Sequence, residues 1–264
     1  MKPVAFLLFL LIICATVSQA QIKIGKKTLN SGKLLNAASE VATAVKLSDK
    51  DIAEMSRKSV ELMDRQNRIS APESEYSERL AGIVEKIGTV EGLSLNFKVY
   101  EVTDVNAFAC GDGSIRIFSA LMDLMTDDEV AAVVGHEIGH VVHTDVKDAM
   151  KNAYLTSAAL NAAGATGAVA EKLTDSQIGA LAESFLNARF SRKQETEADD
   201  YAFDFCIKKG FDPYGMANAL DKLVKLSGGE NASVVQKMFS SHPDSAERAA
   251  RLKEKADKYT AGRK

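Results

Sequence analysis

The sequence predicts a mainly helical α+β fold with one small β-sheet. Several long segments repeat apolar residues at the spacing of three and four that is typical of amphipathic helices. Only two short segments alternate apolar and polar residues, which is the pattern of half-buried strands. Of the 264 residues, 46% are hydrophobic and 26% are charged, so the chain can bury a substantial core.

The expected elements follow in chain order. Helices are expected at residues 48–67, 73–88, 175–209, 213–226 and 245–258, and strands at residues 95–102 and 114–118. Gly111-Asp112-Gly113 provides a turn before the second strand. A plain hairpin packed under a helix would explain the two strands equally well. Residues 152–170 are uncharged but poor in large apolar groups, so we interpret them as a closely packed or mobile helix and not as a membrane span.

The first 20 residues predict a secretory signal peptide with cleavage after Ala20. Lys2 precedes an uncharged run over residues 3–17, whose apolar core of about 15 residues is short for a membrane span. An uncleaved anchor and a lipid anchor at Cys14 remain alternatives, although Ile13 stands where lipidation requires a small residue. We therefore expect an exported protein.

The mature chain would have 244 residues, with 32 basic and 36 acidic side chains and a net charge of −4, because Lys2 is the only charged residue removed. No basic patch indicates nucleic-acid binding. We expect an N-terminal helical extension at residues 21–70 and one domain at residues 71–264. Cys110 and Cys206 could pair in an oxidising compartment, but free buried cysteines pack well and are the more typical state.

The most informative motif is His136-Glu137-Ile138-Gly139-His140. On a helix, residues four apart lie within about 40° of each other, so the two imidazoles converge on one point, whereas Glu137 lies about 100° from His136. Such an HExxH helix typically binds zinc through its histidines and uses its glutamate as the general base. By itself, however, a five-residue match could arise by chance on an amphipathic helix.

The surroundings of this motif favour the zinc interpretation. Thr126 and Glu129 form a capping box that begins a helix just upstream. The helix is apolar on most faces, which is typical of a buried helix. Two histidines and a glutamate in a buried helix need partners, and a metal ion is the most economical one.

A catalytic zinc needs a third protein ligand and an open position for water. His143 is nearest in sequence, but the metzincin pattern requires glycine at position 143 and histidine at position 146, where this chain has His143 and Val146. We therefore interpret His143 as an exposed polar residue at the helix end. Downstream, Glu195 and Asp199 are four residues apart and share a helix face.

This spacing allows Glu195 to ligate the metal while Asp199 accepts the second N–H of a ligating histidine. Glu197 and Asp200 point elsewhere on the same helix, and we expect them to be solvated.

Together these motifs resemble the HtpX-like and CAAX-endopeptidase-like family of zinc metallopeptidases, and within it the small periplasmic members of the LoiP and BepA type. The resemblance covers about residues 70–255. It includes the HExxH helix, an ExxAD motif that starts at Glu195, 55 residues after His140, and two further motifs, namely Asn106-Ala107-Phe108-Ala109 upstream and His242-Pro243 followed by Arg248 downstream.

The resemblance implies a zincin-like metallopeptidase domain and a role for each motif. His136, His140 and Glu195 would be the zinc ligands. Glu137 would be the general base, and Asp199 would be the partner behind the ligands. The edge strand that faces the zinc cleft and holds an extended substrate would be Asn106, Ala107, Phe108 and Ala109. His242 and Arg248 would line the opposite side of the cleft, with Arg248 outside the ligand shell. In some relatives the histidine of the His-Pro motif occupies the open zinc position at rest.

His242 has three possible roles. Asp244 and Glu247 have the spacing of a capping box, which places His242 in a loop ahead of the last helix, where it is free to move. It either closes the zinc site at rest, hydrogen-bonds the oxyanion during turnover, or only caps the loop.

We therefore expect an endopeptidase of the bacterial periplasm, with one Zn²⁺ per chain, that cleaves unfolded or misassembled envelope proteins. Zinc would lower the pKa of its water to about 7, and Glu137 would transfer the proton to the leaving amine. A membrane association through a lipid anchor or an outer-membrane partner is possible. Two alternatives stay open, namely a non-catalytic zinc protein that binds unfolded chains, against which Glu137 argues, and a zinc hydrolase of non-peptide substrates.

Overall fold

The computed structural model describes residues 21–24, 27–30, 47–90, 92–161, 173–229 and 232–263. The expected signal peptide, with Cys14, lies outside these ranges, as does part of the uncharged stretch 152–170. Within the described ranges, no helix is both long and apolar enough to cross a membrane.

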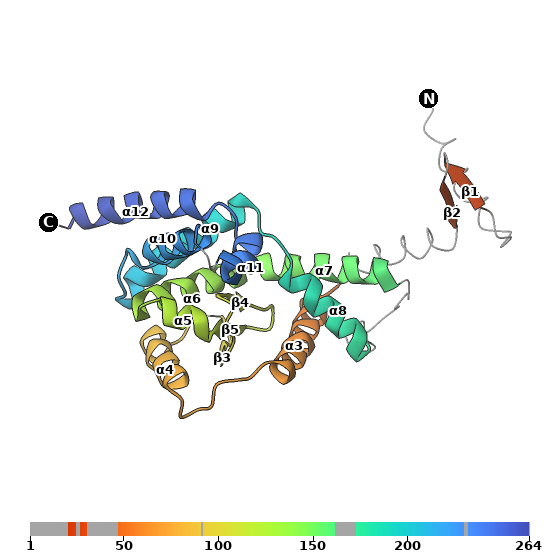
Figure 1. Ribbon diagram of the computed structural model, residues 1–264, viewed down its shortest axis with the longest axis horizontal. Coiled ribbons are helices and arrows are strands. Elements are labelled where there is room, and N and C mark those ends of the chain that lie inside the picture. The colour runs from red at the N-terminus through yellow and green to blue at the C-terminus, as the bar shows by residue number, and fades with distance from the viewer. Residues whose placement is uncertain are drawn as a thin grey trace.

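Helices dominate the fold, as the sequence predicts, and surround a small central sheet (Figure 1). The helices are α3 (Asp49–Gln66), α4 (Glu75–Ile87), α5 (Ser119–Leu124), α6 (Asp127–Val142), α7 (Asp145–Asn161), α8 (Asp175–Leu186), α9 (Arg192–Lys209), α10 (Gly215–Ser227), α11 (Gln236–Ser241) and α12 (Ser245–Ala261), with a 3₁₀ turn, η3, at Ala232–Val235. The strands are β1 (Gln21–Ile24), β2 (Lys27–Asn30), β3 (Asn96–Tyr100), β4 (Ala107–Ala109) and β5 (Ser114–Phe118).

The central sheet has the strand order β3-β5-β4. Strand β5 pairs in parallel with β3 and antiparallel with β4, so the alternative of a plain hairpin between residues 95–102 and 114–118 is wrong. The turn from β4 to β5 requires glycine at Gly113, whose φ is 86° and where an added Cβ would lie 2.2 Å from the carbonyl oxygen of Ser94. This turn leaves β4 at the edge of the sheet.

The N-terminal extension is not helical throughout, which corrects the sequence prediction for residues 21–70. Strands β1 and β2 form a separate antiparallel pair, and helix α3 follows from Asp49. Ser48 caps α3 through a complete capping box with Asp51. Among the described residues of this extension, the helical prediction holds from Asp49 to Gln66.

The single helix predicted at residues 175–209 is also wrong, because the chain breaks it into α8 and α9. The C-cap of α8 is Asn187, and a new capping box between Ser191 and Gln194 begins α9. This second start signal is local, since Gln194 accepts from the backbone N–H of Ser191. The segment between the two helices, residues 187–191, contacts the candidate metal-binding residues through Phe190, as described below.

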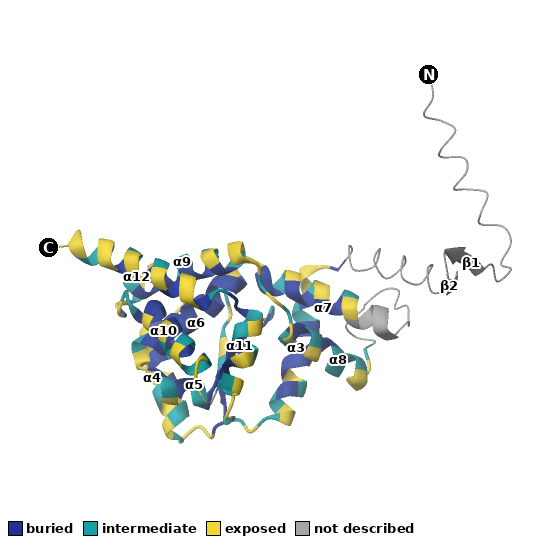
Figure 2. Cartoon of the chain, turned by 45° about the horizontal axis from the view of Figure 1, so that its top comes forward, coloured by how far each residue is buried: buried dark blue, intermediate teal, exposed yellow. Residues whose placement is uncertain are grey.

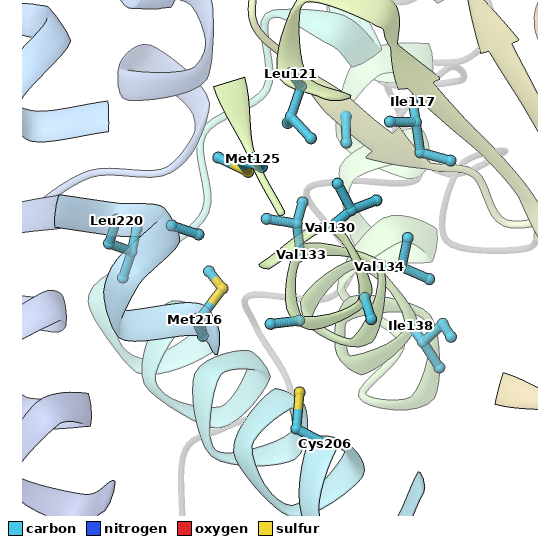
Figure 3. Packing of buried hydrophobic residues seen from close by; sticks show 14 of the residues in the cluster. Ile117, Leu121, Met125, Val130, Val133, Val134, Ile138, Cys206, Met216 and Leu220 are labelled. Atoms are coloured by element: carbon cyan, nitrogen blue, oxygen red, sulfur yellow. The ribbon is translucent and has the colours of Figure 1, made fainter. Parts of the chain in front are cut away.

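Helix α6 lies at the centre of the larger apolar cluster and is almost completely buried (Figure 2). Its capping box, between Thr126 and Glu129, is present as predicted. Side chains of β5 and α5 pack on one side of α6, and side chains of α9 and α10 pack on the other (Figure 3). An added Cβ on Gly139 would lie 3.0 Å from the Cα of Ala198, so glycine allows α6 and α9 to approach closely.

A second apolar cluster joins α3, α7 and α8 to the aromatic side chains of the sheet. Cys110 belongs to this cluster and Cys206 to the first, and both thiols are buried and unpaired. Burial raises the pKa of both thiols, that of Cys206 to about 12. The two cysteines are therefore packing residues, as the sequence analysis favoured.

A buried ion pair fixes α3 to the sheet. Arg116 on β5 is 1% exposed, and its guanidinium donates two hydrogen bonds to Asp64 of α3, at 2.9 and 3.1 Å. Lys98 and Tyr100 of β3 donate to the same carboxylate. Burial raises the pKa of Asp64, but the hydrogen bonds from Arg116, Lys98 and Tyr100 outweigh this effect and lower it to about 2.

Loss of the Asp64 charge should destabilise the fold. The Asp64→Asn variant leaves the Arg116 guanidinium buried without a carboxylate, so we expect the free energy of unfolding to fall by about 3 kcal/mol. Because the folded pKa of Asp64 lies below its unfolded value, its stabilisation is present above about pH 4 and is lost as the pH falls toward 2. Urea unfolding at pH 7 and at pH 3 measures both effects, and the difference between wild type and variant should shrink at pH 3.

Glu61→Gln is the matched control, because Glu61 lies on the same helix and its side chain is 49% exposed. It should change the free energy of unfolding by less than about 1 kcal/mol. An Asp64→Asn variant as stable as this control would contradict the role of the buried pair.

Candidate metal centre

Helix α6 places both histidines of the HExxH motif on one buried face. The Nε2 atoms of His136 and His140 are 3.1 Å apart, and the two side chains, like that of Glu137, are almost completely buried. Because the residues are one helical turn apart, their rings meet edge to face with centroids 4.6 Å apart. The convergence expected from the spacing is present.

Helix α9 brings Glu195 to the same point. One carboxylate oxygen of Glu195 lies 3.6 Å from Nε2 of His136, and the other lies 3.6 Å from Nε2 of His140. The close approach of α6 and α9 at Gly139 makes this possible. His143 ends α6 as its C-cap and is exposed, away from this group. The structure therefore brings together the three residues that the sequence analysis selected as metal ligands.

Asp199 and Arg248 lie behind the ligands. An oxygen of Asp199 is 3.1 Å from Nδ1 of His136, where the sequence analysis placed it. The guanidinium of Arg248 donates two hydrogen bonds to Asp199, at 2.9 and 2.6 Å, and also contacts Glu195. Burial raises the pKa of Asp199, but the hydrogen bonds with His136 and Arg248 hold it well below its usual range.

The remaining acids of α9 match the sequence analysis in part. Glu197 is partly exposed and lies away from the metal centre. Asp200 is also partly exposed, but it forms ion pairs with Arg251 and Lys255, both at 2.8 Å. These pairs join α9 to α12, so Asp200 is not a purely solvated residue.

Asp145 is a partner of the metal centre that the sequence analysis missed. One oxygen of its buried carboxylate lies 2.8 Å from Nδ1 of His140. Helix α6 ends at Val142, and Thr144, with a φ of 66°, turns the chain back so that Asp145 faces His140. The available signal was an acidic residue just past a helix that ends in a ligating histidine, because such a histidine usually donates its second N–H to a carboxylate.

Phe190 is the second residue that was missed. Its ring stacks on that of His140, with centroids 4.0 Å apart and an interplanar angle of 15°. The ring also lies 5.2 Å from that of His242, and the backbone N–H of Phe190 donates to the carbonyl of Ser241. Phe190 therefore covers the metal centre from the segment between α8 and α9. No local pattern in the sequence distinguishes it from other apolar residues.

His242 lies in the loop ahead of α12, as predicted, but its buried ring lies inside the centre, which corrects the expectation that it is free to move. It is the C-cap of α11, and the residue is 5% exposed. Its Nδ1 atom is 2.9 Å from Glu195 and 3.4 Å from Nε2 of His136, and its Nε2 atom is 3.9 Å from Glu137. Contacts with three residues of the centre hold this ring in place.

The predicted capping box at Asp244 is also wrong. Asp244 has a φ of 63° and makes no side-chain cap of α12. Its carboxylate instead pairs with Arg192, at 2.7 Å. This ion pair connects the start of α12 to the start of α9, so a long-range contact replaces the local one.

The edge strand faces Glu137. The backbone N–H of Ala109 donates to Glu137 Oε2 at 3.1 Å. Asn106 and Cys110 form backbone hydrogen bonds with β5, so the intervening residues Ala107 and Ala109 direct their backbone groups away from the sheet. A small cleft of about 30 Å³ lies along this edge, and its lining includes Asn106, Ala107, Phe108, Ala109, Glu137, Phe190 and His242.

The donor set fits zinc. Because carboxylates lie at both Nδ1 atoms, we infer that His136 and His140 each carry the proton on Nδ1 and an unshared pair on Nε2. Two such pairs 3.1 Å apart, beside the carboxylate of Glu195, repel one another unless a cation lies between them. Tetrahedral zinc with bonds of about 2.0–2.1 Å places two nitrogen ligands about 3.3 Å apart. Together with His242, these ligand atoms all lie within 4.8 Å of one another.

The comparisons with known proteins agree with this geometry. Residues 74–256 match peptidase family M48. The chain belongs to this family. The metalloprotease LoiP of Escherichia coli strain K12 is 41% identical over 240 residues, which cover 90% of this chain and 94% of LoiP. The metalloprotease YcaL of the same strain is 40% identical over 213 residues, which cover 80% of this chain and 82% of YcaL.

A more distant relative is the beta-barrel assembly-enhancing protease of Escherichia coli strain K12. It is 30% identical over 162 residues, which cover 58% of this chain and 33% of that protein. The resemblance inferred from the motifs is thus confirmed. The M48 chain described here is a metalloprotease, and His136, His140 and Glu195 form its candidate zinc site.

Proposed function

We propose that this M48 chain is a zinc-dependent endopeptidase that cleaves unfolded or misassembled proteins of the bacterial cell envelope. The observation that carries the proposal is the position of Glu137, between the metal-binding residues and the edge of β4. The general base and the backbone edge of β4 therefore line one cleft. The expected signal peptide supports the envelope location, and a lipid anchor or an outer-membrane partner would hold the protein there.

The edge of β4 explains how one site can accept varied sequences. A peptide that pairs with Ala107 and with the carbonyl of Ala109 as an additional strand is recognised through its main chain, so its side chains can differ. An extended backbone is available in an unfolded or misassembled protein but not in a folded helix or an internal strand. This argument favours peptides over small non-peptide substrates.

Glu137 is placed for proton transfer. When zinc is bound, it lowers the pKa of a water molecule and polarises the scissile carbonyl. Glu137 Oε2 is held by Ala109, whereas Glu137 Oε1 is buried and has no hydrogen-bond partner among the described residues. This free oxygen can accept the proton of the attacking water and then donate it to the leaving nitrogen.

Arg248 and Asp199 act on the other side of the centre. The guanidinium of Arg248 pairs with both buried acids, Glu195 and Asp199, and compensates their negative charge. Asp199 in turn orients His136.

The experiment that tests the proposal measures the cleavage of an unfolded envelope protein. The wild-type protein should cleave it, a chelator should stop the cleavage, and added zinc should restore it. Binding without cleavage in all samples would support the alternative of a non-catalytic protein that holds unfolded chains. Cleavage of small esters or amides without cleavage of proteins would support the non-peptide hydrolase.

His242 should restrain the resting enzyme. Its ring contacts Glu195 and His136 where an open ligand position is needed, and a hydrogen bond to a charged group is worth about 1.5–3 kcal/mol. We therefore expect His242→Ala to raise the basal cleavage rate about tenfold. Peptide cleavage and the absorption spectrum of the cobalt-substituted protein provide the measurements.

The other two roles of His242 give different results. A loss of activity equivalent to about 2.7–4 kcal/mol would instead assign His242 to the oxyanion. An unchanged rate together with an unchanged spectrum would remove His242 from the site. Ser240→Ala is a suitable control, because Ser240 lies on the same short helix and its hydroxyl donates only to the carbonyl of Gln236.

A further inference from the structure

Asp145 uses both of its carboxylate oxygens. Oδ2 lies 2.8 Å from Nδ1 of His140, and Oδ1 accepts a hydrogen bond from Nε2 of Gln194 at 2.8 Å. Asp145 is 5% exposed, so its contact with His140 is shielded from water, whereas the contact with Gln194 is partly buried. The carboxylate therefore connects the end of the zinc helix α6 to the first turn of α9, one residue before the metal ligand Glu195.

Gln194 likewise uses both ends of its amide. Its Oε1 atom accepts from the backbone N–H and the hydroxyl of Ser191, at 2.9 and 2.8 Å, which completes the capping box of α9. Its Nε2 atom donates to Asp145. A glutamate would complete the capping box as well as glutamine does, but it could not donate to Asp145. The capping box therefore does not explain why residue 194 is glutamine and not glutamate. The hydrogen bond to Asp145 does explain it, because only the amide can donate.

The two carboxylates behind the histidines, those of Asp199 and Asp145, differ in the charged side chains around them. Asp199, behind His136, forms ion pairs with Arg248 and Arg251. Asp145, behind His140, has no lysine or arginine within ion-pair distance in the described part of the chain, and its second partner is the neutral amide of Gln194. The full negative charge of Asp145 thus acts on the imidazole of His140, which makes Nε2 a stronger electron donor.

We propose that Asp145 and Gln194 form a positioning pair that holds His140 for zinc. Asp145 keeps the proton of the ring on Nδ1, so that the unshared pair of Nε2 points at the metal. Gln194 fixes the Asp145 carboxylate relative to Glu195, so the distance between the second and third ligands depends on this hydrogen bond. The pair rests on the zinc site of the proposed function and adds to it two residues that act through His140.

Zinc affinity is the quantity to measure, by competition with a chromogenic chelator on the full chain. The Asp145→Asn variant should bind zinc about 10–100-fold more weakly, the effect typical of losing an outer partner of a ligand. The Gln194→Glu variant should also bind more weakly, because it places two carboxylates in contact while it keeps the capping box. The absorption spectrum of the cobalt-substituted protein should change in both variants, because the His140 ring is no longer held in one orientation.

A double variant separates this pair from a general loss of stability. In the protein with Asp145→Asn and Gln194→Glu, the amide and the carboxylate exchange places, and the hydrogen bond between positions 145 and 194 can form again. Its zinc affinity should be no lower than that of Asp145→Asn alone, although Gln194→Glu alone weakens binding. The control is Asp148→Asn, which removes an exposed acid three residues further along α7 and should keep zinc affinity within about twofold.

The outcomes distinguish this pair from the proposed function. If the wild-type protein does not bind zinc, the metal assignment itself fails, and the pair fails with it. If the wild type binds zinc and both Asp145→Asn and Gln194→Glu match Asp148→Asn in affinity and spectrum, only the pair is overturned. Should Asp145→Asn not fold, Gln194→Glu decides alone, because its helix cap is intact. Additive losses in the double variant would show that the two residues act separately, which also overturns the pair.

Discussion

Replacing Glu137 by glutamine should lower the rate of peptide cleavage about 10²–10⁴-fold, the usual contribution of a general base, and leave the zinc content unchanged. The amide cannot accept the proton of the attacking water. It can still accept the hydrogen bond from Ala109, so the edge strand should keep its place. The three ligands His136, His140 and Glu195 are untouched. Cleavage of an unfolded protein and elemental analysis of the purified variant measure the two results.

Glu197→Gln is the matched control for this variant. It makes the same chemical change at a partly exposed residue of α9 and should cleave as fast as the wild type. Equal activity in Glu137→Gln and Glu197→Gln would contradict the mechanism, because the base would then lie elsewhere. A loss of zinc from Glu137→Gln would show that Glu137 holds the metal centre together, so the loss of activity would not identify a base.

Replacing Glu195 by glutamine should remove most of the zinc. A neutral amide is a poor zinc ligand. We expect the zinc dissociation constant to rise by more than about 100-fold, which is more than the loss of a residue that only hydrogen-bonds a ligand typically causes. The variant also leaves Arg248 with Asp199 as its remaining acidic partner in the centre. Zinc occupancy after dialysis, measured against Glu197→Gln from the same helix, gives the result.

Full occupancy in Glu195→Gln would move the third ligand elsewhere. His242 would then be the next candidate, because it lies within 4.8 Å of both histidine ligands. His143 no longer competes, since it caps α6 on the exposed side. A double variant with His242→Ala would decide between the two ligand sets.

The parts of the site within one helix could be predicted from the sequence. His136 and His140 face the same way because four residues make about one helical turn, whatever the rest of the fold does. The same geometry places Glu195 and Asp199 on one face of α9. The capping box of Thr126 and Glu129 is also local, so the start of α6 was predictable. The roles of the edge strand and of the His-Pro motif were predicted from the resemblance to the family, because spacing alone does not reveal them.

Predictions from local sequence patterns were wrong where a long-range contact competes with the local one. Asp244 has the spacing of a helix cap, but its carboxylate pairs with Arg192, 52 residues away in the sequence. The helical pattern over residues 175–209 hides a break, because residues 187–191 leave the helix and Phe190 covers His140. The pairing of β3 with β5 was equally hidden, since alternation marks a strand but not its neighbour.

The sequence by itself determined the candidate metal ligands of this protein, since their type and spacing belong to single helices and to family motifs. Only the tertiary structure decided that Asp145 supports His140, that Gln194 connects it to the third ligand, and that His242 lies against Glu195. These contacts join residues whose relative positions depend on turns and on the packing of α6 against α9. The geometry of one helix follows from the chain alone, whereas the distance between two helices is set by all the side chains packed between them.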